Sequence, residues 1–307
     1  MAEKFTITQF HDRFPTDAAC LEELKQQKYG TDYVCIVCGK CSRLTRVYER
    51  SAYACQCGAQ VYPLAGTIFH KSSTSLRLWF YAMYLMSVTK SGISAKQLER
   101  ELGVTYKTAW RMMMKIRSLM NDEDEDMLQG AVEIDELYLQ PEWRFKLKYH
   151  GMGQAMRSEI LFGMVERGGR VRVRHIPNAG SGYIHGNILQ HVSKSAKVYT
   201  DQAWIYRSLE KKGYWHRTVN HSLKVYARGS IHTQTIEGFW SQIKRGFRGV
   251  YRHVSPKYLQ LYANEYAWRY SNRMSEINMF DILLQRSEVS ANPHHQISAS
   301  SLLRHEV

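Results

Sequence analysis

The sequence has no long hydrophobic run. In its 307 residues the most apolar stretch, LRLWFYAMYLMSV at 76–88, is 13 residues long and includes Arg77, whereas a membrane-spanning helix needs about 20 apolar residues. No N-terminal stretch has the charged, apolar and small-residue order of a signal peptide. We therefore expect no membrane segment, a buried helix at 76–88 and a protein of the reducing cytoplasm.

Cysteine is missing from most of the chain, because all six cysteines fall within residues 20–57. Such a local cluster is typical of a metal site and argues against a disulfide framework spread through the fold. Two close pairs, each followed by a glycine, are separated by 16 residues that include the strand-like RLTRVYERSAYA. This layout predicts a zinc ribbon with one structural zinc, and its ligands would be Cys35, Cys38, Cys55 and Cys57.

Two cysteines lie outside the paired pattern. We expect Cys20 and Cys41 to be small buried hydrophobic residues, although Cys41 is near enough to Cys38 for the two to exchange roles as a ligand. The alternative for the whole cluster is a set of buried cysteines that bind no metal. Residues 5–28, with apolar positions at helical spacing, precede the ribbon as a short helical segment.

Acidic residues are scarce relative to basic ones. The chain has 42 Lys and Arg against 28 Asp and Glu, a net charge of +14 and a pI near 9.5, which favours polyanionic partners, with nucleic acid first and an anionic membrane surface second. Residues 71–120 carry nine basic residues and two acids, and 211–257 carry ten and one, whereas 122–136 holds eight acids and no Lys or Arg. Basic blocks around an acidic patch suit phosphate contacts beside a metal site.

The first basic block is predicted to be helical. SAKQLEREL, Gly103 and TYKTAWRMMMKIRSLM read as helix, glycine turn and helix, with Thr105 as a cap. This arrangement predicts a helix-turn-helix DNA-binding segment whose second helix would present Lys107, Arg111 and Lys115, together with Tyr106 or Arg117. The alternative is a helical packing domain with solvated basic residues.

Beyond residue 130 the hydrophobic period changes to two. AVEIDELYL, EILFGMVE and RVRVRHI read as three strands, the last two joined across Arg167–Gly168–Gly169. A helix-like segment, the strand KVYTD, the helical AWIYRSLEKKG, the strand-like GYWHRTVN and a long helix from near Thr235 follow. This order predicts an α/β fold with a mixed sheet covered by helices, as in ribonuclease-H-like nucleases.

Three carboxylates fall on two of these strands and on the long helix. Asp135 and Asp201 fall on neighbouring predicted strands, and Glu237, which 35 residues separate from Asp201, opens the long helix. Carboxylate oxygens suit a pair of Mg²⁺ or Mn²⁺ ions, which can act on a phosphodiester. Glu133 shares a strand face with Asp135 and is a reserve candidate. Lys244 and Arg248 continue the Glu237 face of the helix, and with Arg245 they are candidate phosphate contacts.

Several motifs resemble the DDE transposases of bacterial insertion sequences, in the group with a zinc ribbon ahead of a ribonuclease-H-like domain. The likeness spans nearly the whole chain and is carried by FPTDAAC (14–20), the paired cysteines, PLAGTIFH (63–70), GISAKQLERELGVTYKTAW (92–110), VEIDELY (132–138), VYTDQAW (198–204), VNHS (219–222) and HTQTIEGFWSQIKRGFRGVYRHVS (232–255).

The resemblance implies cut-and-paste DNA transposition with two Mg²⁺ ions. It implies catalytic roles for Asp135, Asp201, Glu237 and Lys244, and it matches His221 to a histidine of the family. One departure is Gln234, which stands where the family pattern has asparagine; if that position supplies the third ligand, Gln234 competes with Glu237 for the role. A second departure is the absence of the proline often found in the first cysteine pair.

We thus expect a helical segment and zinc ribbon at 1–70, a helix-turn-helix segment at 71–121 and an acidic linker at 122–130. A ribonuclease-H-like transposase domain at 131–285 and a tail at 286–307 follow. The expected partners are element ends and target DNA, with a homodimer or larger synaptic complex and no membrane, in a bacterial cytoplasm at the nucleoid. Two alternatives stay open: a transposase-derived DNA-binding repressor without catalysis, and a ribonuclease-H-like nuclease.

Overall fold

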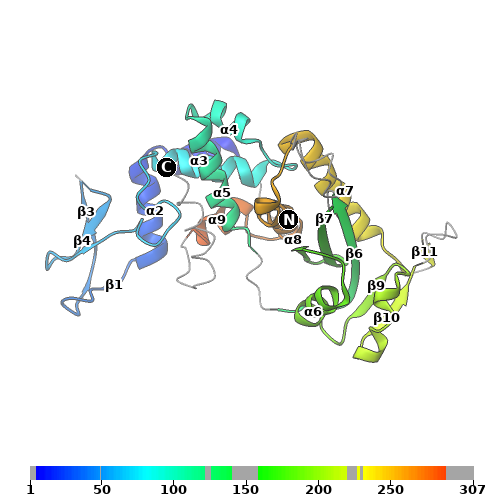
Figure 1. Cartoon of the computed structure of the whole chain (residues 1–307). Helices are drawn as coiled ribbons and strands as arrows, with labels where there is room; N and C mark the ends of the chain where they lie inside the picture. Colours follow the sequence, from blue (N-terminus) through cyan, green and yellow to red (C-terminus); the bar gives the residue numbers. More distant parts are fainter. Residues whose placement is uncertain are drawn as a thin grey trace, which may run out of the picture. The chain divides into compact units, whose positions relative to one another are not determined.

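The computed structural model describes residues 5–48, 50–121, 126–139, 158–219, 227–228 and 231–287 (Figure 1). Their backbone divides into two compact units. The first contains the described parts of 1–89, 95–119 and 275–307, and the second those of 90–94 and 120–274. The predicted site residue His221 and the acids at 122–125 lie outside the described residues.

The first unit begins with the helical segment and the ribbon. Helices α1 (Ile7–Arg13) and α2 (Asp17–Tyr29) are each capped by a threonine side chain, from Thr6 and Thr16, so the predicted helical segment is confirmed. Two small antiparallel sheets follow. One pairs β1 (Tyr33–Val34) with β2 (Cys41–Ser42), and the other has the order β3 (Thr45–Val47), β4 (Ala52–Ala54), β5 (Gln60–Val61).

Four further helices complete this unit: α3 (Leu76–Val88), α4 (Ala95–Leu102), α5 (Tyr106–Ser118) and α9 (Met279–Gln285). The buried α3 has the predicted bounds. Gly103, at φ +65°, ends α4, and Thr105 then caps α5 by accepting from the Thr108 N–H. The Phe280 ring of α9 packs against Phe10, Phe14 and Phe80, so α9 belongs to this unit, and the domain boundaries drawn from sequence stay predictions.

The second unit is built on a mixed five-stranded sheet in the order β10-β9-β6-β7-β8. Its antiparallel part is β6 (Ala131–Leu139), β7 (Glu159–Glu166) and β8 (Val171–Ile176); β9 (Lys197–Thr200) and β10 (Trp215–Thr218) run parallel to β6. Gly168, at φ +76°, turns the chain between β7 and β8. A short pair, β11 (Ala227–Arg228) and β12 (Ile231–His232), follows β10. The predicted mixed α/β fold is confirmed.

Strand β6 presents its two faces to different helices. On one face Val132 and Ile134 join a buried cluster with Ile184 and Ile188 of α6 (Ser181–His191). On the other face Glu133 and Asp135 meet α7 (Gln234–Gly246). The alternation of a strand places odd and even residues on opposite sides, so the acids at 133 and 135 lie together under α7.

Helix α7 continues into a π-helical turn at Phe247–Tyr251 and is followed by α8 (Leu259–Ser271). The Gln260 amide of α8 covers the exposed edge of β8, because it accepts from the His175 N–H at 2.7 Å and donates to the Val173 carbonyl at 2.9 Å. The predicted helix at AWIYRSLEKKG forms only as 3₁₀ turns at Trp204–Tyr206 and Glu210–Lys212. Among the described helices none is long and apolar enough to cross a bilayer.

Candidate functional site

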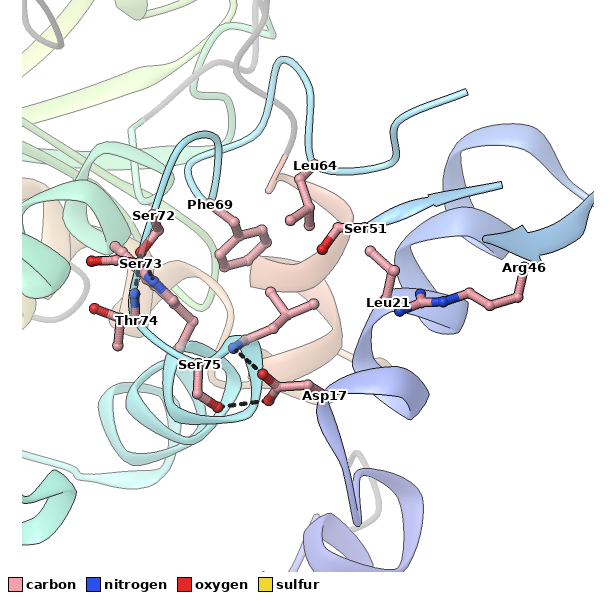
Figure 2. Close-up of a pocket in the computed structure, with 12 residues that line it drawn as sticks. Asp17, Leu21, Arg46, Ser51, Leu64, Phe69, Ser72, Ser73, Thr74 and Ser75 are labelled. Carbon is pink, nitrogen blue, oxygen red and sulfur yellow. Dashed lines mark hydrogen bonds between the residues drawn. The ribbon is translucent and has the colours of Figure 1, made fainter. Parts of the chain in front are cut away.

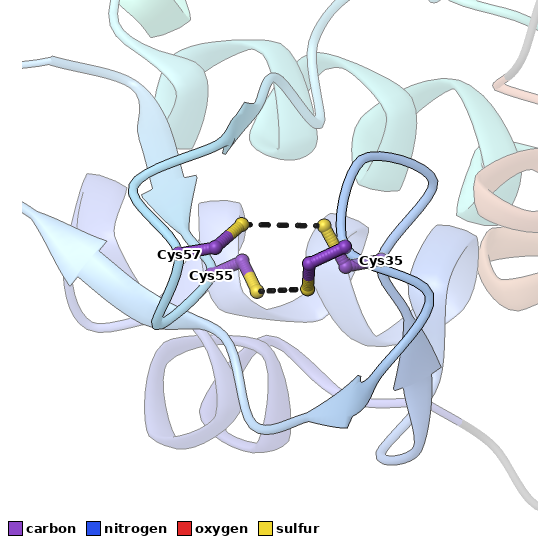
Figure 3. Close-up of side chains that lie close together, drawn as sticks. Cys35, Cys55 and Cys57 are labelled. Carbon is purple, nitrogen blue, oxygen red and sulfur yellow. Dashed lines mark hydrogen bonds between the residues drawn. The ribbon is translucent and has the colours of Figure 1, made fainter.

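The four paired cysteines converge in the first unit. Their thiol sulfurs all lie within 4.8 Å of one another, with Cys35 and Cys57 3.7 Å apart and Cys38 and Cys55 3.8 Å apart (Figure 3). A tetrahedral ion with metal–sulfur bonds of about 2.3 Å holds its sulfurs about 3.8 Å apart. The geometry therefore fits a zinc ion.

A glycine closes the turn at each cysteine pair. Gly39 at φ +68° and Gly58 at φ +88° follow the two pairs, and their N–H groups donate to the Cys35 and Cys55 carbonyls. The backbone N–H of Cys38, followed by that of Val37, lowers the pKa of the Cys35 thiol, whereas the neighbouring thiols raise the pKa of Cys57 to about 11 against the backbone hydrogen bond at Ala59.

The two remaining cysteines have different outcomes. Cys20 is buried as predicted, and burial raises the pKa of its thiol to about 12. The prediction for Cys41 is wrong, because this residue is exposed at the start of β2. A sheet of two strands with two residues each has no core in which the Cys41 side chain could be buried.

A polar hollow of about 210 Å³ also lies in the first unit (Figure 2). Its acid, Asp17, is already occupied: the carboxylate accepts from the Ser75 hydroxyl at 2.6 Å and from the N–H groups of Leu76 and Arg77 at 3.2 and 2.8 Å. Ser75 itself makes no side-chain capping bond. Asp17 therefore caps the start of α3, which explains the acid without a ligand.

The basic residues predicted to face DNA differ in their surroundings. Lys107 is exposed at the start of α5, and Arg111 is partly buried. Lys115 donates to the Ile68 carbonyl at 3.1 Å, and burial lowers its pKa. Arg117 is fully buried, so it cannot present its guanidinium to DNA. The helix-turn-helix contacts of Lys107, Arg111 and Lys115 stay predictions.

In the second unit, Asp135 and Asp201 belong to neighbouring parallel strands. The pairing of β6 with β9 ends at Glu133 opposite Tyr199. Two residues further along each strand are Asp135, inside β6, and Asp201, directly after β9. Since parallel strands advance together, the two carboxylates lie at one level of the sheet.

Trp240 fixes the orientation of Asp135. Its indole Nε1–H donates to Asp135 Oδ2 at 3.0 Å, and the ring is only 3% exposed. Gly163 pairs with Asp135 on β7, and a Cβ there would lie 2.5 Å from Trp240 Cζ2. Glycine at 163 is what allows the indole to approach β7 this closely.

The other two acids are also held by specific donors. Asp201 Oδ1 accepts from the Ala203 N–H at 3.0 Å, which closes a short turn after β9. Glu237 lies in the first turn of α7, where its Oε1 accepts from the Thr233 hydroxyl at 3.0 Å. Glu237 is exposed, as is Gln234 one turn earlier.

The acids interact electrostatically. Burial raises the pKa of Asp135 to about 6, and the charges of Asp201 and Glu237 add to the rise against the hydrogen bonds that oppose it. Burial also raises the pKa of Glu136 to about 7, helped by Asp135 and Asp201, although Tyr206 donates to this carboxylate. Among the described residues, the four thiols are the only set of three or more potential ligands whose atoms lie within metal-binding distance of one another. The carboxylates influence one another by charge across a more open arrangement.

Glu133, the reserve candidate for a metal ligand, instead contacts the start of helix α7. Its side chain is fully buried and accepts from Arg167 Nε at 2.7 Å, from the Thr235 hydroxyl at 2.9 Å and from the N–H groups of Thr235 and Ile236 at 2.8 and 3.0 Å. With both oxygens engaged in this way, the Glu133 carboxylate acts as a cap for α7.

Helix α7 separates its apolar and polar faces. Ile236, Phe239, Trp240 and Ile243 are buried, whereas Lys244, Arg245 and Arg248 are exposed. Lys244 follows Glu237 by two helical turns. On α8, Glu265 and Arg269 are both buried and bond to each other at 2.7 Å, so this pair supports the fold and does not face a ligand.

Sequence reasoning missed the residues that hold the acids. Thr233 and Trp240 lie within the motif at 232–255, but their contacts with the acids leave no local signal. The same holds for Arg167, and Glu133 was considered only as a substitute ligand. One signal was available: Gly163 interrupts the apolar strand EILFGMVE, and an interior strand glycine marks the close approach of another group.

The sequence is similar to one protein family and to a protein of a mobile element. Residues 127–271 match the family described as the ISXO2-like transposase domain. The matched segment begins just before β6 and ends with α8. A protein in transposable element ISH50 of Halobacterium salinarum is 30% identical over 235 residues, covering 71% of this chain and 78% of that relative. The second match extends the likeness beyond the sheet-bearing unit.

Proposed function

This chain belongs to the family of ISXO2-like insertion-sequence transposases, and we propose that it cleaves the ends of its element and joins them to target DNA. The observation that carries the proposal is the placement of Asp135 on β6, Asp201 after β9 and Glu237 in the first turn of α7. Two adjacent strands and the helix packed on them carry three carboxylates that are near enough for the charges of Asp201 and Glu237 to act on Asp135.

The carboxylates would hold two Mg²⁺ or Mn²⁺ ions. Hard oxygen donors suit these ions, and the raised pKa of Asp135, caused by burial and then by the charges of Asp201 and Glu237, describes a cluster of negative charge that a cation would relieve. When bound, such ions supply activation of the attacking hydroxyl and stabilisation of the leaving oxygen in phosphoryl transfer. Trp240, the Ala203 N–H and Thr233 each hold one carboxylate in orientation.

The basic residues would bind the phosphates of the DNA. Lys244 is our candidate for the contact nearest the reacting strand, since it is exposed on the Glu237 side of α7, and Arg245 and Arg248 extend that surface. We assign Lys107, Arg111 and Lys115 of the first unit to DNA contact as well, although Lys115 also bonds to the Ile68 carbonyl. Arginine and lysine contacts of this kind position the duplex and carry little sequence information.

The four-thiol site would hold one structural zinc. Its sulfur distances fit tetrahedral coordination, and the bound ion would stabilise a module whose strands are two or three residues long. Two element ends must be brought together for joining, so we expect a homodimer or larger synaptic complex on DNA at the bacterial nucleoid.

Purified protein, Mg²⁺ and DNA carrying the element ends test the proposal. We expect end cleavage followed by joining of the new 3′-hydroxyl end to a target plasmid. End binding without cleavage would replace the proposal with a DNA-binding repressor, and cleavage without joining would replace it with a ribonuclease-H-like nuclease. Inverted repeats that flank the gene would supply the DNA ends for the experiment.

A further inference from the structure

Helix α7 begins without a capping bond from its own N-cap residue. Thr233 occupies that position, yet its side chain makes no capping bond to the helix backbone, and its hydroxyl donates to Glu237 Oε1 at 3.0 Å. The first N–H groups of a helix need acceptors from elsewhere. Glu133 supplies them, because its Oε2 accepts from both the Thr235 and the Ile236 N–H groups.

The cap on α7 comes from the strand that carries Asp135. Glu133 and Asp135 share one face of β6, so each bond from Glu133 to the helix also sets the height of α7 over Asp135. Glu133 is fully buried, and a buried carboxylate is stable only when its oxygens are satisfied. A shift of α7 along the sheet would break several charge-assisted hydrogen bonds together.

Arg167 connects Glu133 to strand β9, which leads to Asp201. Its Nε donates to Glu133, its Nη2 donates to the His232 carbonyl at 2.8 Å, and its guanidinium lies 4.3 Å from the centre of the Tyr199 ring. Tyr199 is the β9 residue paired with Glu133, two positions before Asp201. The Glu133–Arg167 pair thus contacts β6, β9 and the segment that leads into α7.

We infer that Glu133, supported by Arg167, is a positioning residue that holds Glu237 at the correct distance from Asp135 and Asp201 for the three to share metal ions. The inference rests on the proposed function for its catalytic consequence. Its geometric part, that Glu133 fixes the start of α7, stands independently. Glu133 itself contacts the helix and not the reacting atoms.

Glu133→Gln is the direct test, because it keeps the volume of the side chain and replaces one acceptor oxygen by a donor that faces an N–H group. Hydrogen exchange measured by mass spectrometry on DNA-free protein should show faster exchange at the start of α7, around Thr235 and Ile236. The matched control is Glu210→Gln, whose carboxylate bonds to Arg217 on the exposed surface of the same unit. That variant should leave exchange in α7 unchanged.

The catalytic consequence is measured as the dependence of strand joining on Mg²⁺ concentration. Loss of a residue that orients metal ligands costs about 10- to 100-fold in metal affinity or activity, so Glu133→Gln should need about tenfold or more Mg²⁺ for half-maximal joining. Its affinity for end DNA should stay within about twofold of wild type, as phosphate contacts on α7 tolerate small shifts. A residue with only a structural role would lower the yield of folded protein without moving the Mg²⁺ requirement.

Arg167→Lys provides a second variant if Glu133→Gln does not fold, because lysine keeps the charge but lacks the planar guanidinium that donates to Glu133 from Nε and to the His232 carbonyl from Nη2. Unchanged exchange at the start of α7 in the folded variant would overturn the geometric part. Faster exchange with an unchanged Mg²⁺ requirement would overturn the positioning role. If wild-type protein joins no DNA, the proposed function fails, and the exchange measurement still decides whether Glu133 holds the helix.

Discussion

The Trp240 indole N–H donates to Asp135 Oδ2 at 3.0 Å, and it can do so only because residue 163 has no side chain. A helix residue thereby holds a strand carboxylate in one rotamer. Charged groups that must share an ion gain from such support, since their repulsion favours other rotamers when no ion is bound. The contact links the packing of α7 directly to the proposed chemistry.

Gly163→Ala tests this contact. The new Cβ would lie 2.5 and 2.6 Å from two atoms of the Trp240 ring, so we expect a loss of about 1–3 kcal/mol in the free energy of unfolding together with slower strand joining. Chemical denaturation and a joining assay measure the two effects. Gly182→Ala on α6, where a Cβ meets nothing within 4 Å, is the matched control and should be neutral.

The double variant Gly163→Ala/Trp240→Phe separates packing from hydrogen bonding. The smaller ring relieves the crowding, so stability should recover in part, while joining stays slow because phenylalanine donates no hydrogen bond to Asp135. Full recovery of joining in this variant would show that the indole N–H has no role.

Asp135→Asn should stabilise the protein in the absence of Mg²⁺ and Mn²⁺. Its pKa of about 6, raised by burial, lies above the value of about 3.9 in an unfolded chain, so ionisation costs folding energy. At low pH both states are protonated and the cost vanishes; it grows as pH rises from about 4 and is complete above about 6. Replacement by a neutral amide, which can still accept from Trp240, removes the cost.

We expect a gain of roughly 3 kcal/mol at pH 7.5, falling to about half by pH 5. Denaturant titrations of the zinc-loaded protein at the two pH values measure it, with Glu210→Gln as a control for removal of an exposed charge. A gain that does not change with pH would mean that Asp135 is not under this electrostatic strain.

Cys57→Ser should lower the zinc content and expose the ribbon to protease. The variant removes one of four sulfurs that fit a single ion, and short strands cannot hold the module without it. Metal analysis and limited proteolysis provide the measurement. Cys41→Ser, which changes an exposed thiol outside the set, should retain about one zinc per chain; equal zinc loss in both variants would contradict the assignment.

Glu237→Ala and Gln234→Ala decide the third catalytic position. Loss of a ligand itself should reduce joining by more than the roughly 10- to 100-fold expected for a supporting residue. We expect that loss for Glu237, whose charge acts on Asp135, and near-normal joining for Gln234→Ala. The reverse order of severity would transfer the role to Gln234.

Much of the fold could be predicted from local patterns. The strands at 131–139 and 159–166 and the helix at 76–88 were predicted with their observed bounds, because apolar alternation in the first and near-continuous apolar runs in the other two leave few alternatives. The segment 203–213 was harder, since Ile205, Tyr206 and Leu209 are buried by the sheet and the chain there follows that packing in 3₁₀ turns. Tertiary contacts of this kind leave no periodic pattern of apolar residues in the local sequence.

For the candidate site, the elements that carry the acids could be predicted, but the residues that contact the acids could not. The strand and helix patterns placed Asp135, Asp201 and Glu237 on two strands and a helix. In the structure Asp135 lies in β6, Asp201 directly follows β9 and Glu237 is in the first turn of α7, and their catalytic roles stay predictions. The role of Glu133 was not predictable, because alternation gives the face of a strand residue but not its partner, and Thr235 lies 102 positions further along the chain. Contacts made across such distances depend on how α7 lies on the sheet.

Strand joining by wild-type protein and by Asp201→Ala, compared at equal occupancy of end DNA with Mg²⁺, tests the central claim most directly. The side chain of Asp201 accepts a local bond from the Ala203 N–H, only two residues further along the chain. Because the loss of a local bond disturbs little else, Asp201→Ala should leave the fold and end binding largely intact. The account predicts efficient joining by wild type and none above background by the variant. Joining by Asp201→Ala well above background would contradict it.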